Sequence, residues 1–323
     1  MPFLDSLEEW HTPAAFQRAH PETGNHRDVA RLFSKLTKMG LVEREGRAIV
    51  DWSWHEWMPE AAFFHFGTRD SRYPADLLEH ELPLIEKAKT IPQPAPTKTS
   101  AGPRSTLPTA TGMGELGQTL RSRRTWRQFA DTPVALQPIA TLLALTFGVQ
   151  RRGRVHGQGS VVFKTSPSGG ARHPIEAYLI AQSVTGLRRG VYHYDCLSHE
   201  LVRVGRPVSA AQLEKVLGNQ YYFANCAAVV VMTACFARTM WRYPFTRAYR
   251  SVLIEAGHLG QTFALLATAM ELAPFQTIAF GDTKLEALIG LNGPNESAMY
   301  VVGVGNRKPG AMDHPGRIHP RKR

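Results

Sequence analysis

The stretch of residues 251–272 constrains the fold most, because it has the pattern of one long helix that is apolar almost all round. Such a helix has to be covered by other elements on most of its surface. The apolar run at residues 227–236 makes a similar demand, since a strand without polar alternation is covered on both faces. Together they predict an α+β fold in which helices cover both faces of a sheet, in three layers.

Other segments fit this architecture. Helical periodicity is expected at residues 115–124 and 138–147, strands at 176–183 and 298–304, and a hairpin of residues 191–195 with 200–204. Residues 88–112 are rich in Pro, Thr, Ser and Ala, a composition typical of a linker. We therefore predict an N-terminal module (residues 1–87), this linker, a catalytic domain (residues 113–309) and a basic disordered tail (residues 310–323).

The N-terminal module has the pattern of a small winged helix. A helix is expected where apolar residues recur at helical spacing, and Gly40 ends it; these residues are Val29, Leu32, Phe33, Leu36 and Met39. Residues 41–50 then read as a short hairpin. Such a module binds DNA or docks a protein or peptide. We favour docking, because charges along a helix usually form only a solvated face.

The net charge of +11 is concentrated in two places. Residues 121–154 hold seven arginines against one aspartate, in an expected helix start and a loop, and residues 305–323 hold six basic residues against one aspartate. The surpluses of positive charge in these two segments, +6 and +5, together equal the net charge of the whole chain. A basic charge confined in this way suits an anionic ligand better than a continuous nucleic-acid-binding face.

The cysteines and the lengths of the apolar runs indicate the cellular compartment and whether a structural zinc site is expected. Cys196, Cys226 and Cys235 are odd in number and lack a CxxC spacing, so we expect neither a disulfide framework nor a zinc site. The longest apolar run is far shorter than the roughly 20 residues that span a bilayer, and the acidic N-terminus does not resemble a signal peptide. We expect a cytoplasmic protein without a membrane span.

Two motifs could bind an anionic, flat ligand. Residues 121–127 carry four arginines, whose planar guanidinium groups can grip phosphate oxygens in pairs. Residues 165–174, here called the glycine turn, contain Ser168, Gly169 and Gly170, and the glycines allow a ligand to approach the backbone closely. Each motif alone also fits an ordinary feature, a solvated helix end or a Gly-rich turn.

Two further motifs carry polar groups that could bind a ligand or transfer a proton. Glu255, His258 and Gln261 are expected to share one face of the long apolar helix, where they form either a ligand wall or satisfied structural contacts. Arg242 precedes Tyr243, and the neighbouring positive charge is expected to lower the pKa of the phenol. The alternative for this second pair is a plain surface loop.

In this order the four motifs resemble those of SagB-type dehydrogenases of the nitroreductase superfamily, over about residues 115–306. The most specific stretches are SPSGGARHPIEAYLIAQS, the GVYHYD hairpin and RAYRSVLIEAGHLGQTF, and AAFFHFGT resembles a segment ahead of the family's linker. The resemblance implies a nitroreductase-like domain preceded by the winged-helix-like module. It also implies FMN at a homodimer interface and the oxidation of peptide-borne azolines to azoles. A precursor peptide and a cyclodehydratase are the implied partners, with neither nucleic acid nor membrane.

The resemblance assigns cofactor-binding residues by motif. Those at the phosphate and ribityl chain are Arg123, Arg124, Thr125 and Arg127, with Arg307 as a further phosphate contact. Those along the flavin ring are Pro167, Ser168, Gly169, Gly170, Gln261, Gly281 and Asp282. The family has a Lys-Tyr pair where this chain has Arg242 and Tyr243. Because Arg stays protonated at neutral pH, Tyr243 is the expected base and Arg242 its electrostatic partner.

Two other readings stay open. The chain could be an NAD(P)H-dependent nitro or quinone reductase of the same fold, which would turn over a nitroaromatic without any peptide. It could also be a regulator or scaffold with a degenerate flavin fold, which would stay colourless after addition of FMN.

Overall fold

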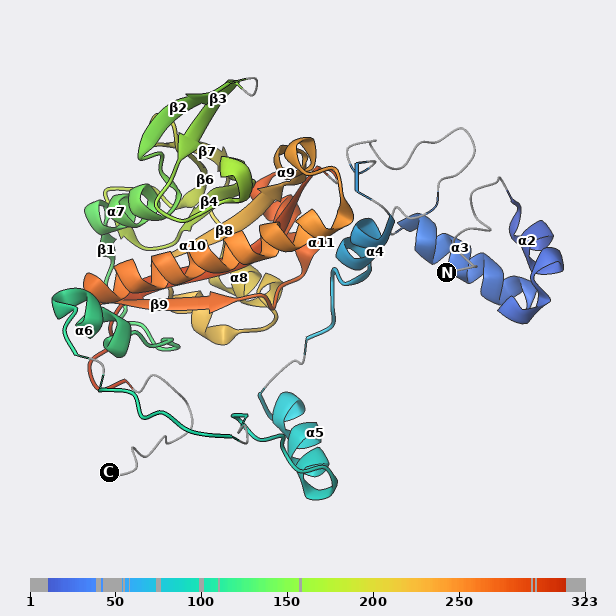
Figure 1. Cartoon of the computed structure of the whole chain (residues 1–323), viewed down its shortest axis with the longest axis horizontal. Coiled ribbons are helices and arrows are strands. Elements are labelled where there is room, and N and C mark those ends of the chain that lie inside the picture. The colour runs from blue at the N-terminus through green and yellow to red at the C-terminus, as the bar shows by residue number, and fades with distance from the viewer. Residues whose placement is uncertain are drawn as a thin grey trace.

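The computed structural model describes residues 11–38, 42, 54, 56–57, 59–73, 77–98, 102–109, 111–156, 159–291, 293 and 295–311. A six-stranded sheet forms its centre, and all neighbouring strands are antiparallel (Figure 1). In spatial order the strands are β7 (Glu200–Gly205), β6 (Gly190–Asp195), β4 (Ile175–Ala181), β8 (Ala228–Cys235), β10 (Glu296–Asn306) and β9 (Leu272–Thr277). The expected strands and the 191–204 hairpin are thereby confirmed.

Helices cover both faces of this sheet, as the apolar runs predict. Alternate residues of the central strand β8 enter different cores, because successive side chains of a strand point to opposite faces. Val230 and Met232 pack with the helices α7 (Leu136–Phe147) and α10 (Tyr249–Ala269). Val229 and Val231 pack with α8 (Ala210–Val216) and α11 (Asp282–Ile289). The three-layer α+β architecture is confirmed.

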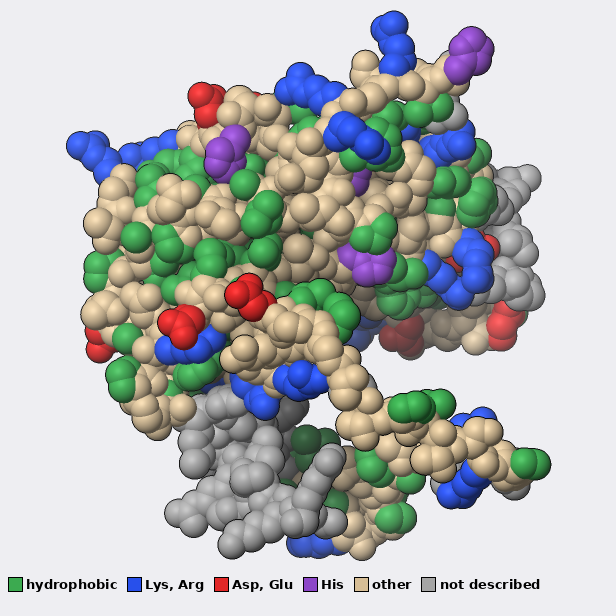
Figure 2. Space-filling view, turned by 60° about the vertical axis from the view of Figure 1, so that its left-hand side comes forward, with side chains coloured by type: hydrophobic (Ala, Val, Ile, Leu, Met, Phe, Trp, Pro, Cys, Tyr) green, Lys and Arg blue, Asp and Glu red, His purple; other side chains and the backbone are tan. Residues whose placement is uncertain are grey.

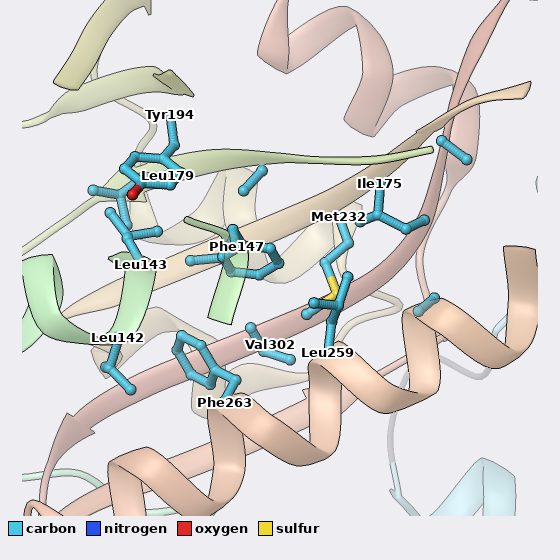
Figure 3. Close-up of a cluster of buried hydrophobic side chains, with 14 of the residues drawn as sticks. Leu142, Leu143, Phe147, Ile175, Leu179, Tyr194, Met232, Leu259, Phe263 and Val302 are labelled. Carbon is cyan, nitrogen blue, oxygen red and sulfur yellow. The ribbon is translucent and has the colours of Figure 1, made fainter. Parts of the chain in front are cut away.

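The first of these cores fixes the position of α10. Leu259 and Phe263 of α10 meet Phe147 of α7 and Met232 of β8 in a close-packed cluster (Figure 3). Burying each such side chain stabilises the fold by roughly 1.5–3 kcal/mol. The helix therefore lies rigidly along the sheet, and it positions any group at its two ends.

The long helix differs from the sequence prediction in two respects. It begins at Tyr249 and ends at Ala269, because Glu271 adopts a left-handed conformation (φ 57°) just before β9. It is also not covered all round. Leu253, Ile254 and Gly257 are exposed along one face, so the helix is central to the fold yet presents an apolar stripe at the surface.

Short strands and helices complete the catalytic part. The predicted helices near residues 115–124 and 138–147 are α6 (Gly114–Ser122) and α7. The remaining elements here are β1 (Val134–Ala135), β2 (Arg151–Val155), β3 (Gly159–Phe163), η3 (Gly169–Ala171), β5 (Val184–Thr185), η4 (Tyr221–Asn225), α9 (Phe236–Arg242) and η5 (Thr246–Ala248). The basic segment at residues 151–154 was expected as a loop, and that prediction is wrong: it is strand β2, paired with β3.

The N-terminal part contains α2 (Pro13–Ala19), η1 (Pro21–Thr23), α3 (His26–Lys38), α4 (Pro59–Gly67) and α5 (Leu77–Thr90). The helix expected before Gly40 is α3, and it buries Val29 and Leu36. The expected hairpin at residues 41–50 lies, apart from Val42, outside the described residues, as does the tail beyond residue 311. Residues 91–98 and 102–109 form neither helix nor strand.

Residues 54, 56–57 and 59–73, here called the strap, belong physically with the catalytic part. Trp54, Trp57 and Ala61 are buried in the same core as α7 and α10. Further along, Arg69 forms a buried ion pair with Glu286 of α11. The strap thus joins the N-terminal part to the core at several points, ahead of the segment predicted to be a linker.

No helix in the described part of the chain has the length and apolar character needed to cross a membrane.

Candidate functional site

The glycine turn has an unusual backbone. Gly170, Ala171 and His173 all have positive φ values, of 59°, 52° and 45°. Residues other than glycine rarely adopt this conformation, and it tends to persist where the surrounding structure enforces it. Two hydrogen bonds do so here: His173 N–H donates to Ser168 Oγ (2.8 Å), and Arg172 Nε donates to Gly170 O (2.9 Å). The turn is therefore a fixed surface, on which Pro167, Gly169 and Gly170 are exposed.

The fold brings Arg242 and Tyr243 onto this turn. A Cβ atom built on Gly170 would lie 2.7 Å from the Tyr243 hydroxyl oxygen and 3.4 Å from Arg242 Cγ. Gly169 similarly faces Ser251 at the start of α10. Glycine at position 170 is thus required by the positive φ and by the close approach of the phenol. Two motifs that are far apart in sequence form one site.

A buried acid lies beneath the turn. Glu255 of α10 is only 4% exposed, and its Oε1 lies 3.7 Å from His173 Nδ1. Burial raises the pKa of Glu255 to about 7, and a hydrogen bond from Ser168 opposes that rise. Burial, reinforced by the charge of Lys164, lowers the pKa of His173 to about 4. Both shifts favour the uncharged forms, so the apparent ion pair is better described as a buried carboxyl group beside a neutral imidazole.

The tautomer of His173 supports this description. Its Nε2 lies 3.1 Å from Val162 O, a contact in which the nitrogen has to donate. Nδ1 then carries a lone pair toward Glu255, which favours the protonated carboxyl group. The sequence pattern grouped Glu255 with His258 and Gln261, and that grouping is wrong: Glu255 is buried, whereas His258 and Gln261 are exposed. His173 was the partner that sequence reasoning missed.

This pair predicts a specific pH dependence of stability. Between pH 4.5 and pH 7 the folded chain keeps the Glu255 proton and the unfolded chain loses it, so this residue's contribution to stability falls as pH rises. The fall corresponds to about 3 kcal/mol across the window. We expect Glu255→Gln to gain about that much stability relative to the parent protein between pH 4.5 and pH 8.

Urea unfolding of both proteins across this pH range measures the difference. The opposite contribution of His173, whose pKa is lowered, is present in both proteins and largely cancels. Curves that stay parallel from pH 4.5 to pH 8 would show that Glu255 does not hold a proton in the folded state.

The strap supports the tyrosine from behind. Trp57 Nε1 donates a hydrogen bond to the backbone oxygen of Tyr243 (3.0 Å). His65 Nδ1 lies 3.0 Å from the hydroxyl of Tyr249, and burial lowers the pKa of His65 to about 3, so a neutral imidazole shares a hydrogen bond with the phenol. The strap therefore fixes both Tyr243 and the first residue of α10.

The predicted phosphate-binding residues lie at the other end of α10. Arg307 donates from Nε to Leu272 O (3.2 Å) and from Nη2 to Thr268 O (3.0 Å), where it caps the helix C-terminus, and it stacks on Trp126. The guanidinium of Arg127 packs over the ring of Phe275. Figure 1 shows α6, which leads into this segment, beside the end of α10 that is remote from α9. We call Arg123, Arg127 and Arg307 the arginine cluster.

The arginine cluster and the glycine turn are thus separated along the helix. Ser251 touches the turn and Thr268 touches Arg307, and this interval of α10 spans about 25 Å at 1.5 Å per residue. Within this chain the described residues of the two groups therefore lie too far apart to line one small pocket. Arg124 turns away, since its Nη1 donates to the backbone oxygens of Arg121 and Arg123.

The other predicted ring-side residues have contacts of their own. Gly281 N–H donates to Val216 O (2.9 Å), and the Asp282 carboxylate accepts from the Asp70 N–H of the strap (2.9 Å). Burial raises the pKa of Asp282. Thr125 is half-buried. The contacts of Gly281 and Asp282 tie α11 to α8 and to the strap.

The described residues include no group of three or more His, Cys, Asp or Glu side chains placed to hold a metal ion. The three cysteines are free thiols.

The structure is that of an α+β protein, with a sheet between two helical layers and a tyrosine that lies against an exposed glycine turn. Residues 120–306 match the Nitroreductase family, and the chain belongs to that family. It is a family of oxidoreductases that typically bind flavin.

Relatives and solved structures agree with this assignment. A Methanocaldococcus jannaschii protein named as a nitroreductase is 29% identical over 60% of this chain and 91% of its own length. The trifolitoxin-processing protein TfxB of Rhizobium leguminosarum is 30% identical, over 45% of this chain and 40% of its own. The Escherichia coli microcin synthetase McbBCD complex with truncated pro-MccB17 contains a chain of similar fold, with a TM-score of 0.58 and 20% identity, covering 82% of this chain and all of that one.

Proposed function

We propose that this chain is an FMN-dependent dehydrogenase that oxidises peptide-borne azolines to azoles. The observation that carries the proposal is the Tyr243 hydroxyl placed against Gly170 of an exposed, rigid turn. Support comes from relatives named as trifolitoxin-processing proteins and from a fold neighbour solved in a synthetase complex with its pro-peptide.

The chemistry of the donor groups fits FMN. Guanidinium groups of the arginine cluster suit a phosphate dianion, and the exposed backbone of residues 167–170 suits a flat ring. Because these groups lie at opposite ends of α10, we propose that a bound FMN takes its phosphate contacts from one protomer and its ring contacts from the partner. Arg123 and Arg127 would hold the phosphate, Thr125 the ribityl chain, and Gln261 the edge of the ring. Arg124, Gly281 and Asp282 are the least supported members of the predicted set, because their contacts lie within the chain.

A homodimer accounts for the apolar stripe on α10. Ile254 is 57% exposed and Leu253 43% exposed, and a side chain at Gly257 would meet nothing within 4 Å. On the neighbouring α6, Leu116 and Leu120 are also exposed. Large apolar side chains gathered on one face commonly mark an interface. A two-fold axis across this stripe would bring the arginine cluster of one protomer toward the glycine turn of its partner.

The residues of this chain would handle the substrate proton. FMN, when bound, supplies the acceptor for the hydride that leaves the azoline ring. Tyr243 is positioned to remove the ring proton, and its backbone is held by Trp57 while its hydroxyl rests on the turn. Arg242 cannot act as a base and instead would hold substrate charge. Burial raises the pKa of Glu255 to about 7, which reduces the negative charge beneath the turn near neutral pH.

The N-terminal part would provide the docking function. We propose that the winged-helix-like module (residues 1–87) binds the precursor peptide or a cyclodehydratase partner, and that residues 88–112 act as the linker to the catalytic domain (residues 113–309). The strap contacts described above would connect that module to Tyr243.

The archaeal relative favours a second candidate, an NAD(P)H-dependent nitro or quinone reductase. Two measurements on purified protein separate the candidates. We expect a flavin absorbance spectrum, FMN as the released flavin, and slow turnover of a nitroaromatic with NADPH. We also expect a mass loss of two hydrogens per ring when a peptide thiazoline is supplied. Rapid NADPH turnover without azoline oxidation would support the reductase instead, and protein that stays colourless with added FMN would refute both.

A further inference from the structure

A cavity lies beside the glycine turn, lined in part by residues of the turn itself. It has a volume of about 240 Å³, and its walls are β3, the residues after Gly170, and α9. Ala171 and Arg172 form one wall, and Arg238 and Trp241 form the opposite wall. Arg172 follows Gly170 by two residues, and Trp241 immediately precedes Arg242 and Tyr243, so the cavity lies next to the candidate site.

The β3 wall offers backbone hydrogen-bonding groups. Among the described strands β3 pairs only with β2, in an antiparallel register that places Val162 opposite Arg152 and Ser160 opposite Arg154. Val162 O accepts from His173 on the side away from β2. Backbone groups alternate in direction along an antiparallel strand, so Ser160 also directs its N–H and C=O away from β2, and the Val162 N–H lies on the same edge beside the carbonyl that His173 occupies. An extended peptide can add to such an edge as a further strand.

The charge around the cavity is positive. Arg172 stacks on Trp241, with 5.2 Å between its Cζ and the ring centroid, and Trp241 is 62% exposed. Arg238 is neutralised by Glu176 at 2.5 Å. Within the described part of the chain, Arg172 and the β2 residues Arg152 and Arg154 form no ion pair with a carboxylate. Figure 2 shows Lys and Arg side chains around the projection at the top of the molecule, at the height of the β2–β3 hairpin in Figure 1.

We propose that this cavity binds an extended acidic segment of the peptide substrate, which pairs with the edge of β3 and places a carboxylate on Arg172 beside the Trp241 ring. The inference rests on the proposed function for the identity of its ligand as a substrate. It adds that the accepted peptide carries Asp or Glu close in sequence to the ring that reaches Tyr243. Arg172 and Trp241 are then specificity-determining residues.

Peptide-binding measurements test this proposal without requiring catalytic turnover. The probes are two fluorescein-labelled octapeptides, alternating Thr-Asp and alternating Thr-Asn, measured by fluorescence anisotropy with the purified full chain at low salt. In an added strand the alternation places all carboxylates on one face. We expect the Asp peptide to bind at least about tenfold more tightly than the Asn peptide, as charge-assisted hydrogen bonds imply. Methylating alternate backbone nitrogens of the Asp peptide should weaken binding.

The variants locate the site. Arg172→Glu should remove the preference for Asp, and Trp241→Ala, which changes an exposed side chain, should weaken binding of both peptides. The matched control is Lys215→Glu, a charge reversal on α8 on the opposite face of the sheet, and it should bind as the parent does. Equal binding of the two peptides overturns the proposal, as does an equal loss in Lys215→Glu.

The same binding experiment also tests a competing class of ligand, the nicotinamide nucleotides. If NADPH displaces the Asp peptide and Arg172→Glu abolishes NADPH binding, the cavity is a nucleotide phosphate site and the proposal is overturned. Arg172-dependent binding of the Asp peptide without azoline oxidation would retain the acidic-peptide site and refute the proposed reaction. Azoline oxidation with equal binding of the two peptides would retain the proposed reaction and refute the acidic-peptide site.

Discussion

Replacing Tyr243 by Phe should lower azoline oxidation by at least about 100-fold while the protein keeps its yellow colour, because removal of a positioned general base typically costs 10²–10⁴ in rate. The substitution deletes only the hydroxyl that lies against Gly170. The ring stays, and the hydrogen bond from Trp57 goes to the Tyr243 backbone, so the fold should be unaffected. Single-turnover absorbance of the bound flavin and peptide mass together measure the effect.

The matched control for this variant is Tyr221→Phe. Tyr221 is a half-exposed tyrosine on η4, which packs with the core on the opposite face of the sheet. This variant should oxidise the peptide at the parent rate. If Tyr243→Phe also does so with its colour retained, the phenol has no part in the proton transfer.

Mixing two inactive variants should restore activity if the flavin site is shared between protomers. Arg123→Ala should lose most of its flavin, and Tyr243→Phe should keep flavin without turning over. A heterodimer of the two, isolated through two different affinity tags, contains one site with an intact arginine cluster and an intact tyrosine. We expect about half the turnover of the parent dimer, because one of two symmetric sites is complete.

The reciprocal pairing provides the control. A chain carrying both Arg123→Ala and Tyr243→Phe, paired with an unchanged chain, should be nearly inactive, since each site then lacks one component. If instead this pair is half active and the mixed single variants are inactive, both components come from the same chain. That outcome would contradict the separation along α10 as the basis of a shared site.

Sequence patterns were sufficient to predict the layered arrangement of helices and strands. The apolar run now seen as β8, the periodicity of α10 and the β6–β7 hairpin are local signals, and each predicted the element that forms. They failed at β2, whose residues Arg151, Arg152 and Arg154 give no apolar alternation, since this exposed strand pairs with β3 and with no other strand in the described part of the chain. They also failed to show that α10 keeps an exposed face, because periodicity indicates which residues are apolar and not what covers them.

For the candidate site, too, some features could be predicted from the sequence and others depend on the tertiary structure. The sequence by itself determined the glycine turn, the Arg242–Tyr243 pair and the arginine cluster as chemical groups, because side-chain chemistry is a property of single residues and short motifs. Only the tertiary structure decided that Tyr243 lies on Gly170, that Glu255 faces His173, that Trp57 holds Tyr243, and that the arginine cluster lies at the far end of α10. Distances between segments remote in sequence depend on how helices and strands pack, and packing is fixed by the whole core.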